Sequence, residues 1–415
     1  MNFVIKTLTP LWTGGIQGAG RIYETGILGS LRWWYEAIVR GIGGAACDIT
    51  NKGCEFKGNK LDMTRCDNLR EWYEKLHNAG LCDACILFGT TGWRKAFTLY
   101  VSNGEKLFQG NKILLTSGHK KCKRGGQKHQ YGGWYLMPDS IMDDSIKLEI
   151  NNIRNINHTD IIKIPLLLIH NWANLAAKES NGYGVVSIRE NDEHISISDD
   201  LLNKLPTGSK ITEGFPDLRE FFFIKISFDL ASEPDAWKDI KGINKAFTGT
   251  FDSTCSISNC GRTFKASEEI PNCSTEIMQV YEKKVIPIAS AVRSYLRFQW
   301  PLMSYDQKNY FLGTARNDGV SSKIKVSHAY SIGDNKWEFR VWGWLPCYRD
   351  MEVQYPTGDR DDFFNELFRL LNSKVFWRFI FNGYEAPFEV KEPKFLTNDP
   401  RSKDGLEYLK TLLDT

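Results

Sequence analysis

The sequence predicts an α+β fold made of two successive modules of the same design. The chain of 415 residues is long enough for more than one domain with its own core. Strand-like and helix-like patterns follow one another in the order strand, helix, paired strands, helix, strand. A polar stretch with Pro206, Gly208 and Gly214 separates two such series. This is the split βαβ, or ferredoxin-like, order, so we expect modules at residues 1–205 and 206–415.

The first module begins with an apolar strand at residues 3–8, a glycine-rich loop and a helix at residues 27–40. Within that helix, Ile27, Leu31, Trp34 or Tyr35, and Ile38 recur at spacings of three and four and should pack on the sheet. The opposite side carries charges spaced by four, namely Arg32, Glu36 and Arg40. One interpretation is a ladder of intrahelical ion pairs, worth about 0.5 kcal/mol or less per pair. The alternative is that these arginines help to bind an anion beside the glycine loop, and this is favoured more for Arg32 than for Arg40.

The rest of the first module is more irregular. We expect its further strands at residues 96–101, 112–116, 146–150 and 195–198. The apolar run at residues 164–169 is interpreted as a strand or a short core segment. A large insertion that contains cysteines, from Cys47 to Cys85, follows the first helix.

The second module repeats the order with clearer signals. We expect its elements, in order, at residues 220–228 (strand), 286–298 (helix), 323–328 and 336–344 (paired strands) and 363–381 (helix). The sequence Gly333-Asp334-Asn335 is typical of a hairpin turn between the paired strands. Along the second of these strands, Arg340, Trp342 and Trp344 share a face, which favours either base stacking or, more commonly, core packing.

The loop after the first strand has the composition of an anion-binding site. Its glycines lack a Cβ, so backbone N–H groups can approach a bulky anion; they are Gly14, Gly15, Gly18 and Gly20. The following helix adds the unpaired N–H groups of its N-terminus, and Arg21 adds a fixed charge. Tryptophans accompany the loop, at Trp12, Trp33 and Trp34. An anion larger and flatter than free phosphate fits best, and nucleic acid is the first hypothesis.

Two other segments are candidate nucleic-acid contacts. No acidic residue occurs between Asn111 and Pro138, and this basic segment carries Lys120, Lys121, Lys123, Arg124 and Lys128. Such a loop follows a phosphate backbone without reading its sequence; an ordinary solvated charge run is the alternative. The second segment is a glycine turn with Gly182 and Gly184, for which a plain turn between strands is the alternative.

The cysteine spacing indicates a metal site. Cys82 and Cys85 are separated by two residues, the usual spacing for half of a zinc site. Cys47 and Cys54 lie upstream and complete a set of four soft ligands. We therefore expect a structural zinc ion on these four thiolates, with reduced cysteines in a small core as the alternative. A looser group, Cys255, Cys260 and Cys273, lacks a close fourth ligand, and we expect no metal there.

Composition narrows the class of protein. The apolar content of 42% and charged content of 25% are ordinary for a soluble globular protein. The net charge of +3 is nearly balanced, so a nucleic-acid function depends on local patches. The sequence shows neither a membrane-spanning run nor a signal-peptide pattern, so we expect a cytoplasmic protein without a membrane partner.

No catalytic constellation stands out in the sequence. It has no Walker loop and no His-Glu-x-x-His motif. His119 and His129, in the basic segment, are candidates for the general base and acid of RNA cleavage. Polar residues in a phosphate-contacting loop are the favoured interpretation, and we expect the protein not to be an enzyme.

Several motifs together resemble a known family. They are Thr9-Pro-Leu-Trp-Thr-Gly-Gly, Glu24-Thr-Gly-Ile-Leu-Gly-Ser-Leu-Arg-Trp-Trp-Tyr-Glu, Cys47-Asp, Cys82-Asp-Ala-Cys-Ile-Leu-Phe-Gly-Thr-Thr-Gly-Trp and Trp337-Glu-Phe-Arg-Val-Trp-Gly-Trp. The chain is similar in these motifs to a family of the RAMP superfamily, the first-numbered subunit of the type III-B (Cmr) CRISPR effector complex. The resemblance extends from the start of the chain to its end, although the loops near residues 51–80 and 251–272 are longer than the family leads us to expect.

The resemblance implies two ferredoxin-like, RRM-like modules in a subunit of a ribonucleoprotein for antiviral defence. It implies guide RNA, bound near its 3′ end, target RNA and other Cmr subunits as partners, and no RNA cleavage by this subunit. The alternatives are an endoribonuclease that processes precursor guide RNA and an assembly subunit that touches RNA only in passing. The candidate RNA-binding residues are Gly14, Gly15, Arg21, Ser30, Arg32, Trp93, Arg94, Lys120, Lys121, Lys123, Arg124, Gly182 and Gly184.

Overall fold

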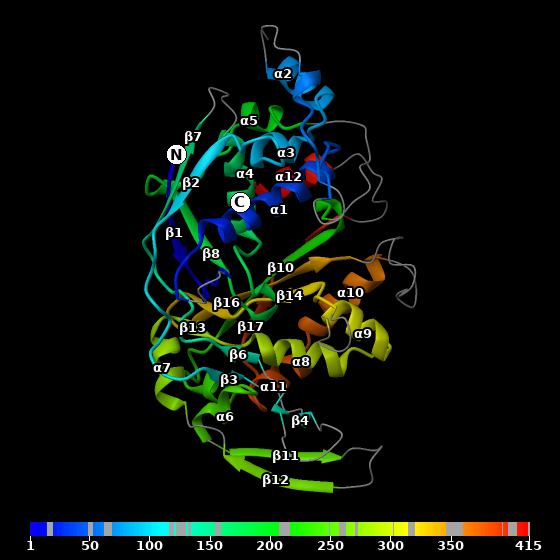
Figure 1. Ribbon diagram of the computed structural model, residues 1–415. Coiled ribbons are helices and arrows are strands. Elements are labelled where there is room, and N and C mark those ends of the chain that lie inside the picture. Colours follow the sequence, from blue (N-terminus) through cyan, green and yellow to red (C-terminus); the bar gives the residue numbers. More distant parts are fainter. Residues whose placement is uncertain are drawn as a thin grey trace.

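In the computed structural model, the chain contains two antiparallel sheets, each flanked by helices (Figure 1). The structure describes residues 1–14, 20–48, 53–61, 69–115, 120–121, 130–131, 134–153, 159–206, 216–248, 250–256, 263–269, 273–301, 303–313, 320–345, 360–391, 393–396 and 405–413. The α+β class predicted from the sequence is confirmed. Within the described residues, no helix is both long enough and apolar enough to span a lipid bilayer.

The first sheet has the strand order β2-β7-β1-β8-β9. Its strands are β1 (Asn2–Thr7), β2 (Phe97–Val101), β7 (Ile146–Asn152), β8 (Val186–Glu190) and β9 (Glu193–His194). Helix α1 (Glu24–Gly41) follows β1, and α4 (Lys163–Asn171) precedes β8. The central strand buries Phe3, Ile5 and Thr7, which alternate with more exposed residues because successive side chains of a strand point to opposite faces. The apolar stripe of α1 joins the same core, so this element order gives the predicted ferredoxin-like arrangement.

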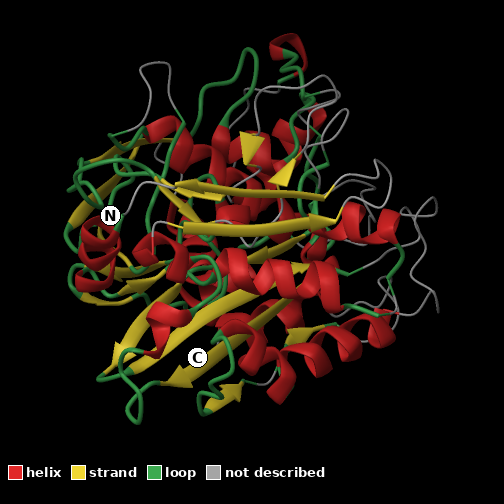
Figure 2. Ribbon diagram, turned by 90° about the horizontal axis from the view of Figure 1, so that it is seen from below, coloured by secondary structure: helices red, strands yellow, loops and turns green. Residues whose placement is uncertain are grey.

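The second sheet repeats this arrangement, with the strand order β13-β15-β16-β10-β17. Its strands are β10 (Phe221–Asp229), β13 (Val285–Ile286), β14 (Ile324–Val326), β15 (Ala329–Gly333), β16 (Lys336–Trp344), β17 (Phe388–Val390) and β18 (Lys394–Phe395). Helices α8 (Ala289–Gln299), α10 (Arg360–Leu371) and α11 (Lys374–Ile380) pack against it. The view from below shows helices lying alongside the long strands (Figure 2). The hairpin turn predicted at residues 333–335 joins β15 to β16.

Further elements surround the two sheets. The additional strands form three short pairs and are β3 (Ile113–Leu115) with β6 (Trp134–Leu136), β4 (Lys120–Lys121) with β5 (Gln130–Tyr131), and β11 (Thr250–Ser256) with β12 (Thr263–Glu269). The additional helices are α2 (Leu69–Asn78), α3 (Asp83–Phe88), α5 (Asp199–Asn203), α6 (Ile243–Thr248), α7 (Ser274–Glu282), α9 (Tyr305–Leu312) and α12 (Gly405–Leu413). The cysteine insertion supplies α2 and α3.

Each half of the chain contributes to the core of the other half. Ile113 and Leu115 of β3 and Leu136 of β6 belong to the hydrophobic cluster of the second sheet. In return, α12 packs on α4, where Trp172 Nε1 donates a hydrogen bond to the backbone oxygen of Leu412 at 2.8 Å. The domain boundary predicted between residues 205 and 206 stays a prediction. Sequence patterns do not reveal the packing of β3 and β6 on the second sheet or of α12 on α4.

Two local predictions are wrong, and a third is decided between its alternatives. Residues 164–169 form a short buried core segment, which is helical and not a strand; an apolar run without alternation is compatible with either. Residues 195–198 follow β9 without strand pairing. The helix expected over residues 363–381 is two helices, since Ser373 accepts a hydrogen bond from Val375 N at 3.1 Å and begins a new helix as its N-cap.

Candidate functional site

The glycine-rich loop is closed at its base by one threonine. Thr13 Oγ1 donates a hydrogen bond to the backbone oxygen of Arg21 at 3.1 Å and accepts one from Tyr23 N at 2.9 Å. Ile22 N also donates to Asn103 Oδ1 at 3.0 Å. The residues on either side of the loop are therefore joined next to the first turn of α1.

The turn at residues 176–180, which directly precedes the second glycine turn, packs against the same place, although it lies about 165 residues later in the sequence. Ala176 N donates to Ser30 Oγ at 3.1 Å, and Ala177 N donates to the backbone oxygen of Trp12 at 3.0 Å. Gly182 and Gly184 are buried with positive φ angles of 96° and 89°. A Cβ on Gly182 would lie 2.7 Å from the His328 ring, so close packing inside the protein accounts for glycine at this position.

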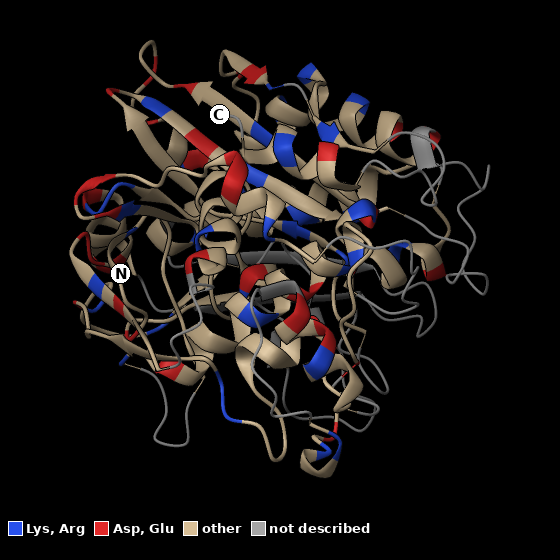
Figure 3. Cartoon of the chain, turned by 90° about the horizontal axis from the view of Figure 1, so that it is seen from above, with Lys and Arg blue, Asp and Glu red and all other residues tan. Residues whose placement is uncertain are grey.

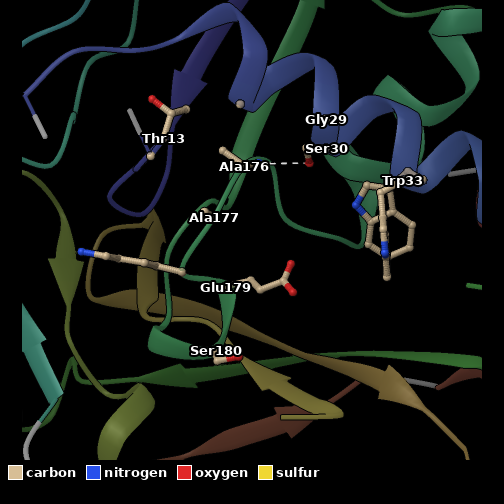
Figure 4. Close-up of a pocket in the computed structure, with 12 residues that line it drawn as sticks. Thr13, Gly29, Ser30, Trp33, Ala176, Ala177, Glu179 and Ser180 are labelled. Carbon is tan, nitrogen blue, oxygen red and sulfur yellow. Dashed lines mark hydrogen bonds between the residues drawn. The ribbon is translucent and has the colours of Figure 1, made fainter. Parts of the chain in front are cut away.

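These segments enclose a pocket of about 410 Å³. Its residues come from the glycine loop, one face of α1 and the turn at residues 176–180, and they are Thr13, Gly14, Gly26, Gly29, Ser30, Trp33, Trp34, Ala176, Ala177, Lys178, Glu179 and Ser180. In Figure 4, Gly29, Ser30 and Trp33 come from one helix, and the turn from Ala176 to Ser180 lies opposite. Two of the predicted RNA-binding residues, Gly14 and Ser30, therefore line one cavity.

Positive charge lies around the pocket. Exposed Arg21 stacks over the ring of Tyr23, with 4.8 Å between guanidinium carbon and ring centroid. Lys178 Nζ lies 4.1 Å from the centroid of the Trp12 ring. Burial lowers the pKa of Lys178, and the charge of Asp139 opposes that shift. Elsewhere, basic and acidic residues are intermingled along the described ribbon (Figure 3). The positive charge available to an anion at the pocket is therefore that of Arg21 and Lys178.

Two of the other candidate residues take part in contacts within the fold. Arg32 donates to Glu36 Oε1 at 2.8 Å and to the backbone oxygen of Gly89 at 2.8 Å. Trp93 is buried, and its Nε1 donates to the backbone oxygen of Ile86 at 3.2 Å. RNA contact by these two residues stays a prediction, and our proposal below does not depend on it.

Arg94 is exposed, and Lys120 and Lys121 form β4. Residues outside the described part of the chain are Gly15, Lys123, Arg124, His119 and His129.

The expected cysteine set comes together in space. The Sγ atoms of Cys47, Cys54, Cys82 and Cys85 all lie within 4.8 Å of one another. Those of Cys47 and Cys85 are 3.5 Å apart. Four sulfurs at about 2.3 Å from a tetrahedral zinc ion are about 3.8 Å from each other, so the cluster is close to the required size. The spacing argument predicted which four residues gather, and the geometry is compatible with a metal ion.

Hydrogen bonds shape the chemistry of the cysteine cluster. Bonds from Cys54 and Cys82 lower the pKa of Cys47 to about 6. Bonds from the other three thiols, with the nearby charge of Arg32, hold the pKa of Cys85 well below its ordinary value. Arg32 Nη2 also donates directly to Cys85 Sγ at 3.3 Å. The lowered pKa values favour thiolates at Cys47 and Cys85, the form in which cysteine binds metals, whereas hydrogen bonds within the same cluster raise the pKa values of Cys54 and Cys82.

A comparison with protein families finds a match in the first half of the chain. A model of the RAMP superfamily matches residues 4–187, which run from within β1 to within β8 and include β2, β7, α1 and α4. We call these residues the RAMP region. The pocket and the cysteine cluster both lie within this RAMP region. No curated protein matches the chain.

Two solved structures are similar to the whole chain at low identity. The crystal structure of apo Cmr1 from Pyrococcus furiosus has 12% identity and a TM-score of 0.36, covering 94% of this chain and 97% of that one. The cryo-EM structure of the type III-B Cmr-β complex bound to cognate target RNA has 10% identity and a TM-score of 0.32, covering 99% of both chains.

The structure also reveals functional contacts that sequence patterns missed. Arg340 of β16 is buried and donates to the backbone oxygens of Ile169, His170 and Ala173 at 2.7–3.0 Å, which caps α4 of the RAMP region. Trp342, on the same strand, is buried and donates from Nε1 to Asn174 Oδ1 at 2.7 Å. Core packing is thus the correct interpretation of Trp342. No local signal marks Arg340 or Lys178, because their partners lie far away in the sequence.

Proposed function

We propose that this protein is a non-catalytic RNA-binding subunit of a cytoplasmic type III-B (Cmr) CRISPR ribonucleoprotein. It binds guide RNA near its 3′ end, target RNA, or both, beside other Cmr subunits. The RAMP match supports the superfamily, and the motif resemblance along the chain supports the particular complex. The observation that carries the RNA-binding part is the meeting of the glycine loop, the glycine-bearing face of α1 and the turn at residues 176–180 at one cavity.

The physical argument for RNA binding concerns the kind of ligand that the pocket residues can hold. A helix N-terminus and glycine backbone favour an anion, and Arg21 and Lys178 add mobile positive charge. Trp33 adds a flat apolar wall. Single-stranded RNA combines phosphates with exposed base faces, so it satisfies both requirements of the surface. A free phosphate would leave the aromatic wall unused.

Binding of labelled single-stranded RNA to the full-length protein, measured over a salt series, tests this function. We expect an affinity that falls as salt rises, because phosphate contacts release counterions. Arg21→Ala should weaken binding to RNAs of different sequence by similar factors. Lys336→Ala is the matched control, since this exposed lysine lies at the start of β16, about 20 Å along the strand from Trp342. Absence of RNA binding by the wild-type protein would overturn the proposal.

The non-catalytic part has a separate test. Incubation of the protein with repeat RNA, with and without chelator, should leave the RNA intact. Specific cleavage that disappears in a double substitution of His119 and His129 would instead establish the processing endoribonuclease. Normal complex assembly combined with no RNA crosslinking would favour the assembly subunit.

We also propose that Cys47, Cys54, Cys82 and Cys85 hold a structural zinc ion. The support is the close approach of four thiols from separate segments of an insertion. The described part of this insertion has two short α-helices, so a metal would tie together segments that are joined by little regular structure. Elemental analysis of the purified protein should find about one zinc per chain, lost in Cys82→Ser. A zinc-free, folded protein would support the alternative of reduced cysteines in a small core.

A further inference from the structure

The pocket face of α1 carries a glycine that no described neighbour requires. Gly29 lies inside the helix and is exposed, and a Cβ added to it meets no atom within 4 Å. Gly26, three residues earlier, is different, because its Cβ would lie 2.9 Å from the side chain of Thr13. Glycine is a poor helix former, so neither helix stability nor internal packing accounts for Gly29. Bare helix surface beside a cavity is suited to a ligand that approaches the backbone closely.

Trp33 is a rigid flat wall of the same pocket. Its ring centroid lies 4.8 Å from that of Trp34 and 5.6 Å from that of Phe221, both in edge-to-face arrangements. The contact with Phe221 joins α1 to β10 of the second sheet, and the two contacts together hold the ring on one side while it stays partly exposed. A ring that is already ordered loses little freedom when a nucleobase stacks on it.

Lys178 supplies a cation at the pocket, where the charge of Asp139 acts on it without a direct ion pair. Among the described residues, no carboxylate forms an ion pair with Lys178, and its ammonium packs over Trp12 instead. The adjacent Glu179 is neutralised within the chain, because Lys325 Nζ lies 3.0 Å from its carboxylate. The pocket therefore keeps one positive charge available for a phosphate.

We infer that this pocket takes one unpaired nucleotide of the bound RNA, with the base on Trp33, the backbone passing Gly29 and a phosphate beside Lys178. The inference rests on the proposed RNA-binding function and adds the place where one nucleotide inserts. A volume of about 410 Å³ is that of a small-molecule site and is too small for a base-paired segment. The nucleotide is thus single-stranded or displaced from a duplex.

Substitutions at Gly29 test the inference, because they should affect folding and binding in opposite directions. Alanine and leucine are better helix formers, so Gly29→Ala and Gly29→Leu should unfold at the same or a higher temperature. Their dissociation constants for single-stranded RNA should nevertheless rise, by about 3-fold for alanine and about 5- to 100-fold for leucine, the range for one lost base stack. Gly333→Ala is the matched control, since its Cβ also meets only open space and the residue lies at the end of β15. It should leave RNA affinity unchanged.

The outcomes separate this inference from the function on which it rests. A stable Gly29→Leu protein with wild-type RNA affinity overturns the pocket assignment and leaves RNA binding standing. Loss of neighbouring-subunit binding with unchanged RNA affinity also overturns it, because the pocket would then hold a protein side chain. Absence of RNA binding in the wild type overturns both proposals.

A second variant keeps the test independent of changes in α1. Lys178→Gln should weaken RNA binding and reduce the magnitude of the salt slope by about 0.7, the value for one phosphate of a single strand. Lys336→Gln should change neither quantity. An unchanged salt slope in Lys178→Gln contradicts the assignment of a phosphate to this lysine.

Discussion

Arg32 of α1 donates a hydrogen bond to Sγ of Cys85, 3.3 Å away, and another to the backbone oxygen of Gly89. The same helix presents Gly29, Ser30 and Trp33 to the pocket. One guanidinium therefore connects the helix that forms the pocket wall to the cysteine cluster of the insertion. The position of the pocket wall and the integrity of the cluster are coupled through this contact.

Arg32→Ala should destabilise the RAMP region. The substitution removes three hydrogen bonds from a largely buried side chain and leaves Glu36 and the Gly89 carbonyl without this donor. We expect a loss of about 1–3 kcal/mol in the free energy of unfolding and faster release of zinc to a chelator. Denaturant unfolding and a colorimetric chelator measure the two effects. Arg94→Ala, at an exposed arginine of the same region, is the comparison, and equal behaviour of the two variants would refute the coupling.

Arg340→Met should loosen the junction between the two halves. Arg340 satisfies three backbone oxygens at the end of α4, and methionine keeps much of its apolar bulk without any donor. We expect a loss of about 2–5 kcal/mol, because buried carbonyls stay unsatisfied. Arg189→Met, on the exposed face of β8, should have little effect. A thermal unfolding curve that matches the wild type would show that Arg340 does not hold α4.

Stability should fall in mild acid because of His170. Burial, followed by the charge of Arg340, lowers its pKa from 6.5 to about 4, and its Nδ1 accepts a hydrogen bond from Ile188 N. The folded state thus favours the neutral ring, so its contribution is complete above pH 6.5 and is lost as the pH falls toward 4. His170→Gln keeps an acceptor that does not titrate in this range. Melting temperatures at pH 7.5 and 5 should differ more for the wild type than for this variant; an equal difference would argue against the assignment.

Replacing Lys120, Lys121, Lys123 and Arg124 by alanine should weaken RNA binding evenly across sequences. If each contacts a phosphate, the salt slope should lose up to about 0.7 per residue, or about 3 in total. Filter binding at several salt concentrations, with RNAs of unrelated sequence, measures both quantities. Unchanged curves and slopes would mean that the basic segment is only a solvated loop.

The arrangement of both modules could be predicted because local patterns carry it. Ile27, Leu31 and Ile38 recur at helical spacing and are buried in α1, and the turn at residues 333–335 marks a hairpin with positive φ at Asn335. The cysteine set was predictable for a similar reason, since the spacing of Cys82 and Cys85 is itself a local signal. Periodicity fails where no period exists, as in the uniformly apolar segment that forms α4.

The rest of the site depends on contacts between distant residues. Lys178 and Trp33 line one pocket although 145 positions separate them, and no sequence motif predicts that they lie close together. Arg32 and Arg40 were expected on a charged helix face, yet Arg40 is fully buried and donates to the backbone oxygens of Cys47 and Pro216. The insertion and the segment before β10 cover that face, and only tertiary structure shows it.

Photo-crosslinking of the full-length protein to 4-thiouridine RNA, followed by mass spectrometry, tests the central claim most directly. We predict crosslinked peptides from the glycine loop with the first half of α1 and from the turn at residues 174–185, with Trp33 among the modified residues. Crosslinks confined to other surfaces, with the peptides of the pocket recovered unmodified, would contradict the claim that RNA binds here.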